Sequence, residues 1–532
     1  RHAGCPSKPA PTATNRPESS TMYLFNNPLM VLLSLAATAA ALLLGLRVLL
    51  GNRKKRGGRR PPVGGTVFNL VFHLADQYDY YTDLARRHGS FRLVHPLGDY
   101  VCLVSPPDVE YILKTNFANY GKGALNYELM SDLLGDGIFA VDGEKWRQQR
   151  KIASFEFSAR NLRDYSSGIF RRKAISLALM VSEAANSHCA VEIQDLLMKS
   201  TLDSIFKVGF GVDLDTLSGS NPEGTKFAKA FDASSQVIHW RYGDVFWKVK
   251  RFLNVGAEAA LKQHLKVIDE FIYKAIQRKT ETLSAQQQDG WMKHDILSRF
   301  LVKGDEGMKM NEKYLRDIIL NLVIAGRDTT AGTLSWFFCM LCKHPEVQDK
   351  VAREVAMATG LGSNISMADF STALTEEALD KMQYLHAAIT ETLRLYPAVP
   401  VDPKVCLSDD TLPGGYNVRK GDLVSYVPYA MGRMKHLWGE DVEEFRPERW
   451  LDEKGIFQPE SPFKFTAFQA GLRICLGKEF AYRQMKIFAA VLVHFFTYEL
   501  KDPDKEIKYK CSLTMSIARG LHVAAFHRGA NA

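Results

Sequence analysis

A cysteine near the C-terminus stands in the most distinctive stretch of the chain. Residues 468–477 have the pattern F-x-x-G-x-R-x-C-x-G, and Cys475 precedes a helical pattern over residues 476–496. At the start of a helix, backbone N–H groups and the helix dipole stabilise an anionic sulfur. Such a thiolate can ligate a haem iron axially and favour O–O cleavage on the far side. The pattern therefore predicts that Cys475 is the ligand of a haem iron.

The other fixed positions of this stretch suit the same chemistry. Phe468 opens the pattern, and Arg473 can pair with a haem propionate. Gly471 would let the loop turn tightly, and Gly477 would let the following helix lie close beneath a flat macrocycle. The alternative is a buried cysteine that precedes a helix by chance, and further motifs must decide between the two.

Two such motifs lie upstream. Trp146 and Arg150 are four residues apart, so on a helix they share a face from which both could reach the propionates. On its own, this spacing is more often a solvated arginine beside a half-buried tryptophan. Residues 325–330 have the sequence A-G-R-D-T-T inside a long helical pattern, where a hydroxyl ordinarily bonds back to the carbonyl four residues earlier.

Two more motifs complete a recognisable series. They are E-x-x-R from Glu391 to Arg394, by itself a commonplace helical ion pair, and F-R-P-E-R-W at residues 445–450. Taken together and in this order, the motifs make the chain resemble the cytochromes P-450, a family of haem-thiolate monooxygenases. The resemblance extends from about Pro61 to Leu521. It implies a heme b whose iron is ligated axially by Cys475. Because the chain has no room for a flavin domain, electrons are expected from NADPH through NADPH–cytochrome P-450 reductase.

The resemblance also implies roles for single residues. The long helix is expected to bulge near Ala325–Gly326 to make room for O₂, with Asp328 and Thr329 relaying protons. Glu391, Arg394 and Arg449 are expected to form a buried network that supports the haem loop. Lys404 stands where many relatives carry a basic propionate partner, usually Arg or His. The residues expected to contact the haem are Trp146, Arg150, Ala325, Lys404, Phe468, Gly471, Arg473, Cys475 and Gly477.

Competing metal and nucleotide patterns are weak. Cys339-x-x-Cys342 resembles half of a zinc or redox site, but it lies in an apolar helical segment and no second ligand pair matches it. We interpret both as buried thiols. The chain has no P-loop, and Gly360-Leu361-Gly362 lacks the strand–turn–helix setting of a dinucleotide site. Eight scattered cysteines are typical of a reducing compartment.

The elements that must position these residues are mainly helical. From Asn311, a candidate N-cap, to His344, just before Pro345, the chain is apolar at helical spacing on most sides. This helix should therefore cross the core of a large domain. Short strand patterns occur at residues 91–94, 100–104 and 423–427. Together they predict a mainly α fold with a small β region, the cytochrome P-450 fold, as one haem domain over residues 66–532.

The N-terminal segment carries the charge of the chain. The 532 residues have a net charge of +9, of which residues 1–21 carry +2 and residues 22–60 carry +7. The rest is neutral, so a nucleic-acid partner is not indicated. Residues 1–21 have the composition of a disordered leader or a non-native extension. Residues 22–50 contain an uncharged apolar run that could span a bilayer, and residues 51–65 form a basic juxtamembrane segment with a Pro/Gly hinge.

The order of these features predicts topology. The basic residues follow the apolar run, whereas a cleaved signal peptide carries its positive charge first. We therefore expect a single transmembrane signal anchor. The positive-inside rule places the catalytic domain in the cytosol, on the endoplasmic reticulum membrane.

The substrate class follows from a closer resemblance. Residues 325–338 and 475–486 are similar to the plant clan of fatty-acid ω-hydroxylases, and most similar to its long-chain branch, which is linked to pollen-wall and cuticle monomers. This implies hydroxylation of a long-chain fatty acid at or near the ω carbon, for monomers of the cutin or sporopollenin type. The pocket is expected to be apolar. Its expected lining segments are residues 117–139, 322–325, 398–401 and 513–517.

Two alternatives stay open. One is a monooxygenase of the same fold that acts on an alkane, a sterol or another lipid. The other is a non-oxygenating haem protein, either an isomerase that uses peroxides or an electron carrier. Such proteins tend to lose the acid–alcohol pair of the long helix. Asp328 and Thr329 are both present here, which argues against them.

Overall fold

A computed structural model describes residues 59–285, 295–298 and 311–529, apart from Leu97, Ala159 and Ser363. The predicted leader (1–21), the predicted anchor (22–50) and residues 51–58 lie outside the described residues. Within the described ranges, no helix combines the length and the hydrophobicity needed to cross a membrane.

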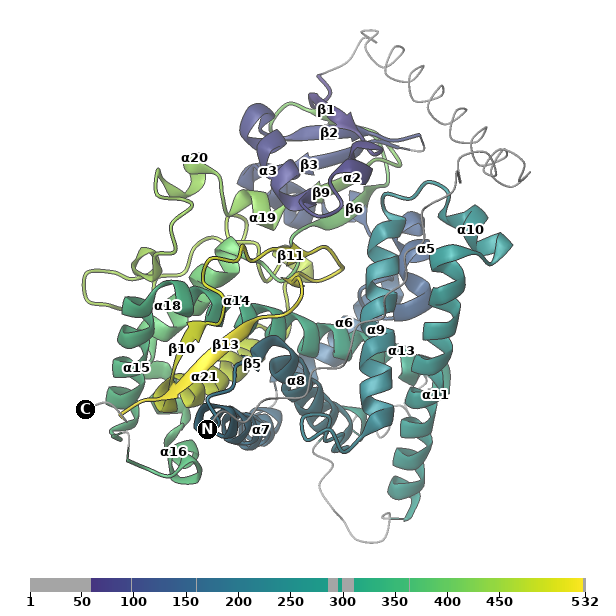
Figure 1. Cartoon of the computed structure of the whole chain (residues 1–532). Helices are drawn as coiled ribbons and strands as arrows, with labels where there is room; N and C mark the ends of the chain where they lie inside the picture. The colour runs from purple at the N-terminus through teal and green to yellow at the C-terminus, as the bar shows by residue number, and fades with distance from the viewer. Residues whose placement is uncertain are drawn as a thin grey trace, which may run out of the picture.

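Helices account for most of the described residues and surround small sheets (Figure 1). The helices before residue 300 are α2 (Asn69–Phe72), α3 (Gln77–His88), α4 (Pro106–Glu110), η1 (Tyr111–Thr115), η2 (Phe117–Asn119), α5 (Gly123–Leu134), α6 (Gly143–Ser158), α7 (Arg160–Asn186), α8 (Ile193–Phe210), α9 (Pro222–Arg241), α10 (Trp247–Leu253) and α11 (Gly256–Ala285). The later ones are α13 (Glu312–Val323), η4 (Ile324–Asp328), α14 (Thr329–Lys343), α15 (Pro345–Thr359), α16 (Met367–Ala373), α17 (Glu376–Lys381), α18 (Gln383–Leu395), α19 (Pro428–Met431), α20 (Lys435–Trp438), η5 (Pro447–Trp450), η6 (Gly471–Arg473) and α21 (Lys478–Phe495).

The predicted long helix is present and is interrupted once. It begins at Asn311, whose side chain caps it by accepting from the backbone N–H of Tyr314. It ends at Lys343, because His344 leaves the helical conformation and Pro345 starts α15. Between α13 and α14, residues 324–328 form a single turn of π-helix. The bulge that was expected near Ala325–Gly326 is therefore confirmed.

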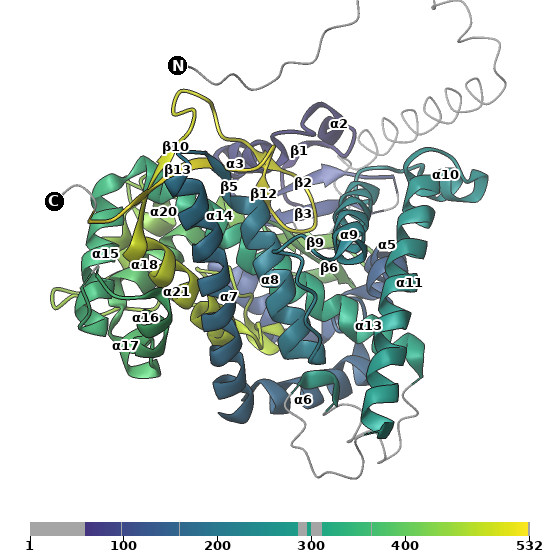
Figure 2. The same ribbon diagram turned by 60° about the horizontal axis from the view of Figure 1, so that its bottom comes forward.

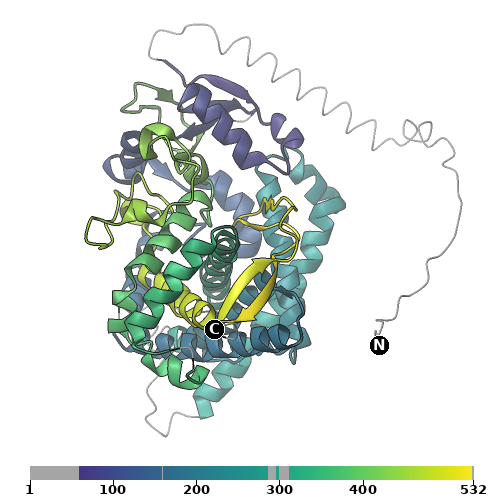
Figure 3. The same ribbon diagram turned by 60° about the vertical axis from the view of Figure 1, so that its left-hand side comes forward.

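A six-stranded sheet joins distant parts of the chain. Its strand order is β1 (Val63–Thr66), β2 (Phe91–Val94), β3 (Tyr100–Leu103), β9 (Leu423–Tyr426), β6 (Asp402–Cys406) and β4 (Tyr120–Gly121). The three predicted strand patterns are thus confirmed. In Figures 1 and 3 this sheet, largely purple, lies at the upper end of the molecule, with helices below. The parallel pairing of β3 with β9 brings residues 100–103 beside 423–426.

A second sheet lies against the helical body. It contains β10 (Phe496–Leu500), β13 (His522–His527) and β5 (Val191–Glu192) in that order. Two small hairpins complete the β structure, β7 (Asp410–Thr411) with β8 (Asn417–Val418) and β11 (Tyr509–Lys510) with β12 (Ser516–Ile517). Figure 2 shows α7 and α8 at the front of the molecule, and these helices pack against each other.

Part of the predicted hinge belongs to the folded body. Val63–Gly65 belong to β1, which pairs with β2. Arg60 explains why, because its guanidinium bridges two carboxylates of the sheet, Asp99 at 2.6 Å and Asp422 at 2.5 Å. The domain boundary placed at residue 66 is therefore corrected to at least Arg60.

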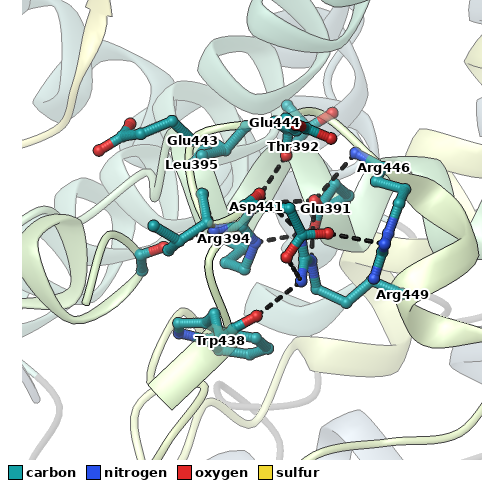
Figure 4. A network of polar contacts seen from close by, with 12 residues as sticks. Glu391, Thr392, Arg394, Leu395, Trp438, Asp441, Glu443, Glu444, Arg446 and Arg449 are labelled. Atoms are coloured by element: carbon teal, nitrogen blue, oxygen red, sulfur yellow. Dashed lines mark hydrogen bonds and ion pairs between the residues drawn. The ribbon is translucent and has the colours of Figure 1, made fainter. Parts of the chain in front are cut away.

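The expected Glu391–Arg394–Arg449 network is present, and Figure 4 shows its contacts. Glu391 and Arg394 face each other through two hydrogen bonds of 2.8 Å, and both side chains have 0% exposure. Arg449 reaches Glu391 at 3.3 Å, and the indole N–H of Trp450 donates to it at 2.9 Å. Arg394 also donates to the carbonyls of residues 432, 442 and 444. Helix α18 is thereby tied to the segment that precedes the Cys475 loop.

Removing Arg394 should destabilise the protein strongly. In Arg394→Met, Glu391 would be a buried carboxylate without its main cation and three carbonyls would lose a donor. We expect a loss of about 3–5 kcal/mol of unfolding free energy, measured by chemical denaturation followed by circular dichroism. The matched control is Arg446→Ala, because the Arg446 side chain is half exposed and pairs with Asp441 at 2.7 Å, while only its backbone N–H contacts Glu391. It should cost about 1 kcal/mol or less. Equal midpoints for Arg394→Met and the wild type would refute the supporting role.

Candidate active site

The Cys475 loop is fixed by its backbone. The N–H of Cys475 donates to the carbonyl of Phe468 at 2.8 Å, which closes the loop. Gly471 has φ +62°, and a Cβ at this position would lie 2.0 Å from the carbonyl oxygen of Leu113. Only glycine fits there, as expected from the motif. Gly471 thus shapes the loop through Leu113 and does not line the cavity described next.

A cavity of about 260 Å³ lies between this loop and the central helix. Most of the residues predicted to contact a haem line it. They are Trp146, Arg150, Ala325, Phe468, Arg473, Cys475 and Gly477, together with the predicted relay residue Thr329. Segments more than 300 residues apart in the sequence therefore meet at one site, as the order of motifs predicted.

The thiol of Cys475 is accessible because it faces this cavity. Burial raises the pKa of the thiol, while the backbone N–H of Gly477, Arg150 and Lys478 lower it. Helix α21 begins at Lys478, so the expected help from a helix N-terminus is present in the form of the Gly477 N–H. The groups that stabilise an anionic sulfur are local and positively polarised.

Two arginines and a tryptophan form one edge of the cavity. The guanidinium of Arg473 lies over the ring of Trp146, 4.4 Å from its centroid, and donates to Asp142 at 2.6 Å. The Nε of Arg473 is buried without a hydrogen-bond partner. Arg150 has no carboxylate partner among the side chains that the structure describes. Both arginines therefore present donor capacity that protein groups do not use.

Lys404 lies on the β6 strand, beside Asp402. It is fully buried and pairs with Asp402 at 2.6 Å, and it does not line the cavity. Burial lowers the pKa of Lys404 to about 7, helped by Lys122 and Arg473 and opposed by Asp402. Asp402 engages this ammonium from within the β6 strand, and the propionate contact expected of Lys404 stays a prediction.

Lys122 is the cation that sequence reasoning missed. Its ammonium pairs with the other oxygen of Asp402 at 2.9 Å, and the residue lines the cavity. Nothing in the local sequence marks it, since it belongs to none of the motifs. Its position depends on a contact between residues 122 and 402, which the sequence alone does not reveal.

The two predicted relay residues at the π-helical turn differ in their exposure to the cavity. Thr329 lines the cavity, and its hydroxyl donates to the carbonyl of Ala325 at 2.5 Å. Asp328 is buried behind it, next to Arg327 at 2.9 Å, and accepts from the hydroxyl of Thr514. Burial raises the pKa of Asp328 to about 7 in spite of Arg327. This carboxyl can therefore carry a proton near neutral pH.

Gly326 has a packing role at the bulge. A Cβ at this position would lie 2.7 Å from Cδ1 of Ile205 on α8. Glycine is thus required for the close approach of α8 to the π-helical turn. The alanine and glycine of the motif leave a recess in the cavity wall, since Ala325 is exposed to the cavity.

A second chamber of about 170 Å³ continues from the first. Lys122, Phe139, Ala325, Thr329, Val399 and Gln469 line both chambers. All four segments predicted to form the substrate pocket contribute to the lining. The segment 398–401 does so over its whole length, and the segment 322–325 does so through residues 322, 324 and 325. The segment 117–139 contributes through Lys122 and residues within 130–139, and the segment 513–517 contributes through residues 513 and 514. The chamber extends towards α3 and α9 through Tyr81 and His239.

The competing cysteine pair is structural. Cys339 is buried and Cys342 is half-buried on α14, and both are free thiols. Burial raises the pKa of Cys339 to about 11. Across the described ranges, no cluster of three or more His, Cys, Asp or Glu side chains could hold a metal ion.

A family model described as Cytochrome P450 matches residues 57–522 of the chain. The chain is a member of the cytochrome P450 family. Similar proteins include Cytochrome P450 704C1 of Pinus taeda, 50% identical over 511 residues, which cover 93% of this chain and 98% of the relative. Cytochrome P450 704B1 of Arabidopsis thaliana is 45% identical over 90% of this chain and 96% of its own length. Cytochrome P450 86B1 of the same plant is 37% identical over 88% and 85%. The protein is thus a haem-thiolate monooxygenase.

The residues of the cavity fit the haem that this family membership implies. Cys475 supplies a sulfur that faces the cavity, and Arg473 supplies a buried Nε without a partner. A guanidinium with a free N–H suits a carboxylate, and two propionates need such donors. Trp146 holds Arg473 in place from below by a cation–π contact. Arg150 and Lys122 are the other cations at the cavity wall.

Cys475→Ala should abolish the thiolate signature of the haem. We expect the long-wavelength band of the reduced carbon-monoxide complex to disappear, because alanine offers no axial ligand. Absorption spectra of microsomes provide the measurement. Cys342→Ala removes a half-buried thiol outside the cavity and should leave the band in place. A band that survives in Cys475→Ala would assign the ligand to another cysteine.

Proposed function

We propose that the protein hydroxylates long-chain fatty acids at or near the ω carbon, with O₂ and with electrons from NADPH through NADPH–cytochrome P-450 reductase. The observation that supports this best is the pair of connected chambers, which extends away from Cys475 and is lined mainly by apolar side chains. An alkyl chain could lie in the second chamber, with its methyl end towards the cavity that fits the haem. The resemblance of residues 325–338 and 475–486 to plant fatty-acid ω-hydroxylases supports the same substrate class.

The setting we propose is the endoplasmic reticulum membrane, with the catalytic domain in the cytosol. The support is the apolar run within residues 22–50 and the basic residues that follow it. A lipid substrate dissolved in the same membrane would be available to an anchored enzyme. The product class we propose is a monomer for cutin or sporopollenin.

When bound, the haem supplies O₂ activation and insertion of one oxygen atom into a C–H bond. The chain contributes binding, exclusion of water and proton supply. Apolar residues such as Leu322, Val399 and Phe139 exclude water from the alkyl chain. Thr329 presents its hydroxyl at the junction of the two chambers.

Proton supply is the second contribution of the chain. Burial raises the pKa of Asp328 to about 7, so this carboxyl can hold a proton near neutral pH. Asp328 borders the second chamber through Thr514. The hydroxyl of Thr514 donates to Asp328, and Thr514 lines that chamber. We propose that Asp328 and Thr329 deliver protons to the reacting oxygen.

The substrate proposal is tested with a panel of acids. Microsomes that contain the protein and its reductase are incubated with fatty acids of graded length, from lauric to stearic acid, and the position of the new hydroxyl is determined by mass spectrometry. We expect NADPH-dependent hydroxylation at or next to the methyl end. Microsomes with Cys475→Ala provide the background. Turnover of alkanes or sterols without terminal hydroxylation of any acid would replace this proposal by another lipid substrate.

Thr329→Ala should uncouple reductant use from product. Loss of the hydroxyl should lower product per NADPH by about tenfold or more and increase peroxide release, because a positioned proton donor is missing. The matched control is Ser335→Ala. Ser335 makes the same back-bond to the carbonyl four residues earlier, at 2.6 Å, but is buried away from both chambers. Normal coupling in Thr329→Ala would remove the proposed relay role.

A further inference from the structure

The guanidinium of Arg327 lies between two carboxylates from different helices. Its two terminal nitrogens bind both oxygens of Asp232, at 2.5 and 3.2 Å, and one of them also donates to Asp328 at 2.9 Å. The side chain of Arg327 is 4% exposed, and its Nε has no partner. One buried cation thus serves two anions, and the better geometry goes to Asp232.

The two carboxylates differ in position. Asp328 is the last residue of the π-helical turn and is buried. Asp232 is on α9, and its side chain is 48% exposed. Helix α9 packs against α11, which packs against α13, and the three lie side by side in Figures 1 and 2. Helix α9 also lines the second chamber through His239.

This sharing affects the charge that Asp328 experiences. Burial and the carboxylate of Asp232 raise the pKa of Asp328, and the guanidinium of Arg327 lowers it. The hydroxyl of Thr514 is the remaining neighbour, and it favours the ionised form by donating. Without Asp232, Arg327 would be left to Asp328 alone, and the repulsion between the carboxylates would be lost. Both changes favour the ionised form of Asp328.

We propose that Asp232 is a positioning residue of the proton relay, which draws Arg327 towards α9 and so leaves Asp328 able to carry a proton. The proposal rests on the proposed function, because it assumes that Asp328 donates protons during turnover. It assigns a role to a half-exposed residue outside both chambers and outside every motif of the chain. It also makes the relay sensitive to the position of α9, the helix that borders the second chamber.

The test is the pH dependence of coupling in Asp232→Asn. Product per NADPH is measured in microsomes with the reductase, from mildly acidic to mildly alkaline pH, with a fatty acid that the wild type hydroxylates. Coupling in the wild type should fall as pH rises through the pKa of Asp328, because the donor loses its proton. In Asp232→Asn the fall should occur at lower pH, by roughly one pH unit. Asp232→Ser removes the same charge with a smaller side chain and should show the same shift.

Matched variants make the outcome specific. Asp232→Glu restores the carboxylate and should restore the wild-type profile. Glu223→Gln removes an exposed carboxylate from the same helix, where it pairs with Lys274 at 3.0 Å, and should leave the profile unchanged. The reduced carbon-monoxide spectrum of each variant reports whether the haem domain is intact.

The variant Asp328→Asn separates the relay role of Asp328 from the positioning role of Asp232. If Asp328→Asn remains fully coupled, the relay itself is refuted. If Asp328→Asn uncouples and neither Asp232→Asn nor Asp232→Ser shifts the profile, Asp232 has no positioning role and the relay stands. A shift in both neutral variants, with rescue by Asp232→Glu, supports the proposal.

Discussion

The buried carboxylate of Glu391 is the contact on which the cysteine loop depends. A carboxylate with no exposure is tolerable only if several donors surround it, and here Arg394, Arg449, Trp450 and the N–H of Arg446 do so. These donors come from α18 and from a segment more than 50 residues later, so the interaction fixes their relative position. The ring of Trp450 then packs against Phe465 at 4.9 Å, three residues before the loop that carries the thiol begins at Phe468. An ion pair far from the chemistry thereby positions the sulfur.

Charges near the two sides of the cavity are distributed unequally. Beside the six-stranded sheet, Lys122 and Lys404 share the single carboxylate of Asp402. Behind the central helix, Asp232 and Asp328 share the single guanidinium of Arg327. The first cluster has cationic groups in excess, which suits an anionic cofactor edge. The second has carboxylates in excess, which favours a protonated acid. The same device, one counterion for two like charges, therefore produces opposite electrostatics on two sides of one site.

Much of this site could be predicted from local sequence, because the responsible constraints are local. Cys475 before a helix follows from a short motif, whereas the Ala325–Gly326 bulge was expected from the resemblance to the family, and the structure shows both. The segments that line the substrate chambers were likewise expected from the resemblance. In contrast, Lys122 lines the cavity only because Asp402 lies beside it in the fold. Neither residue belongs to a motif, and their pairing depends on tertiary contacts 280 residues apart.

Two departures from regular backbone geometry lie at the active site. The π-helical turn at 324–328 replaces ordinary α-helical hydrogen bonding where Thr329 must face the cavity. In the cysteine loop, Gln469 has φ +58° although it is not glycine, and Gly471 has φ +62° against Leu113. A left-handed glutamine persists only where its surroundings impose it, and here the closing bond from Cys475 to Phe468 supplies that constraint. Similar departures occur elsewhere, in the π-helical turn η1 and at Asn254, which has φ +53°. What distinguishes the two at the active site is that both border the cavity that Cys475 faces, so local strain there has a role in the chemistry.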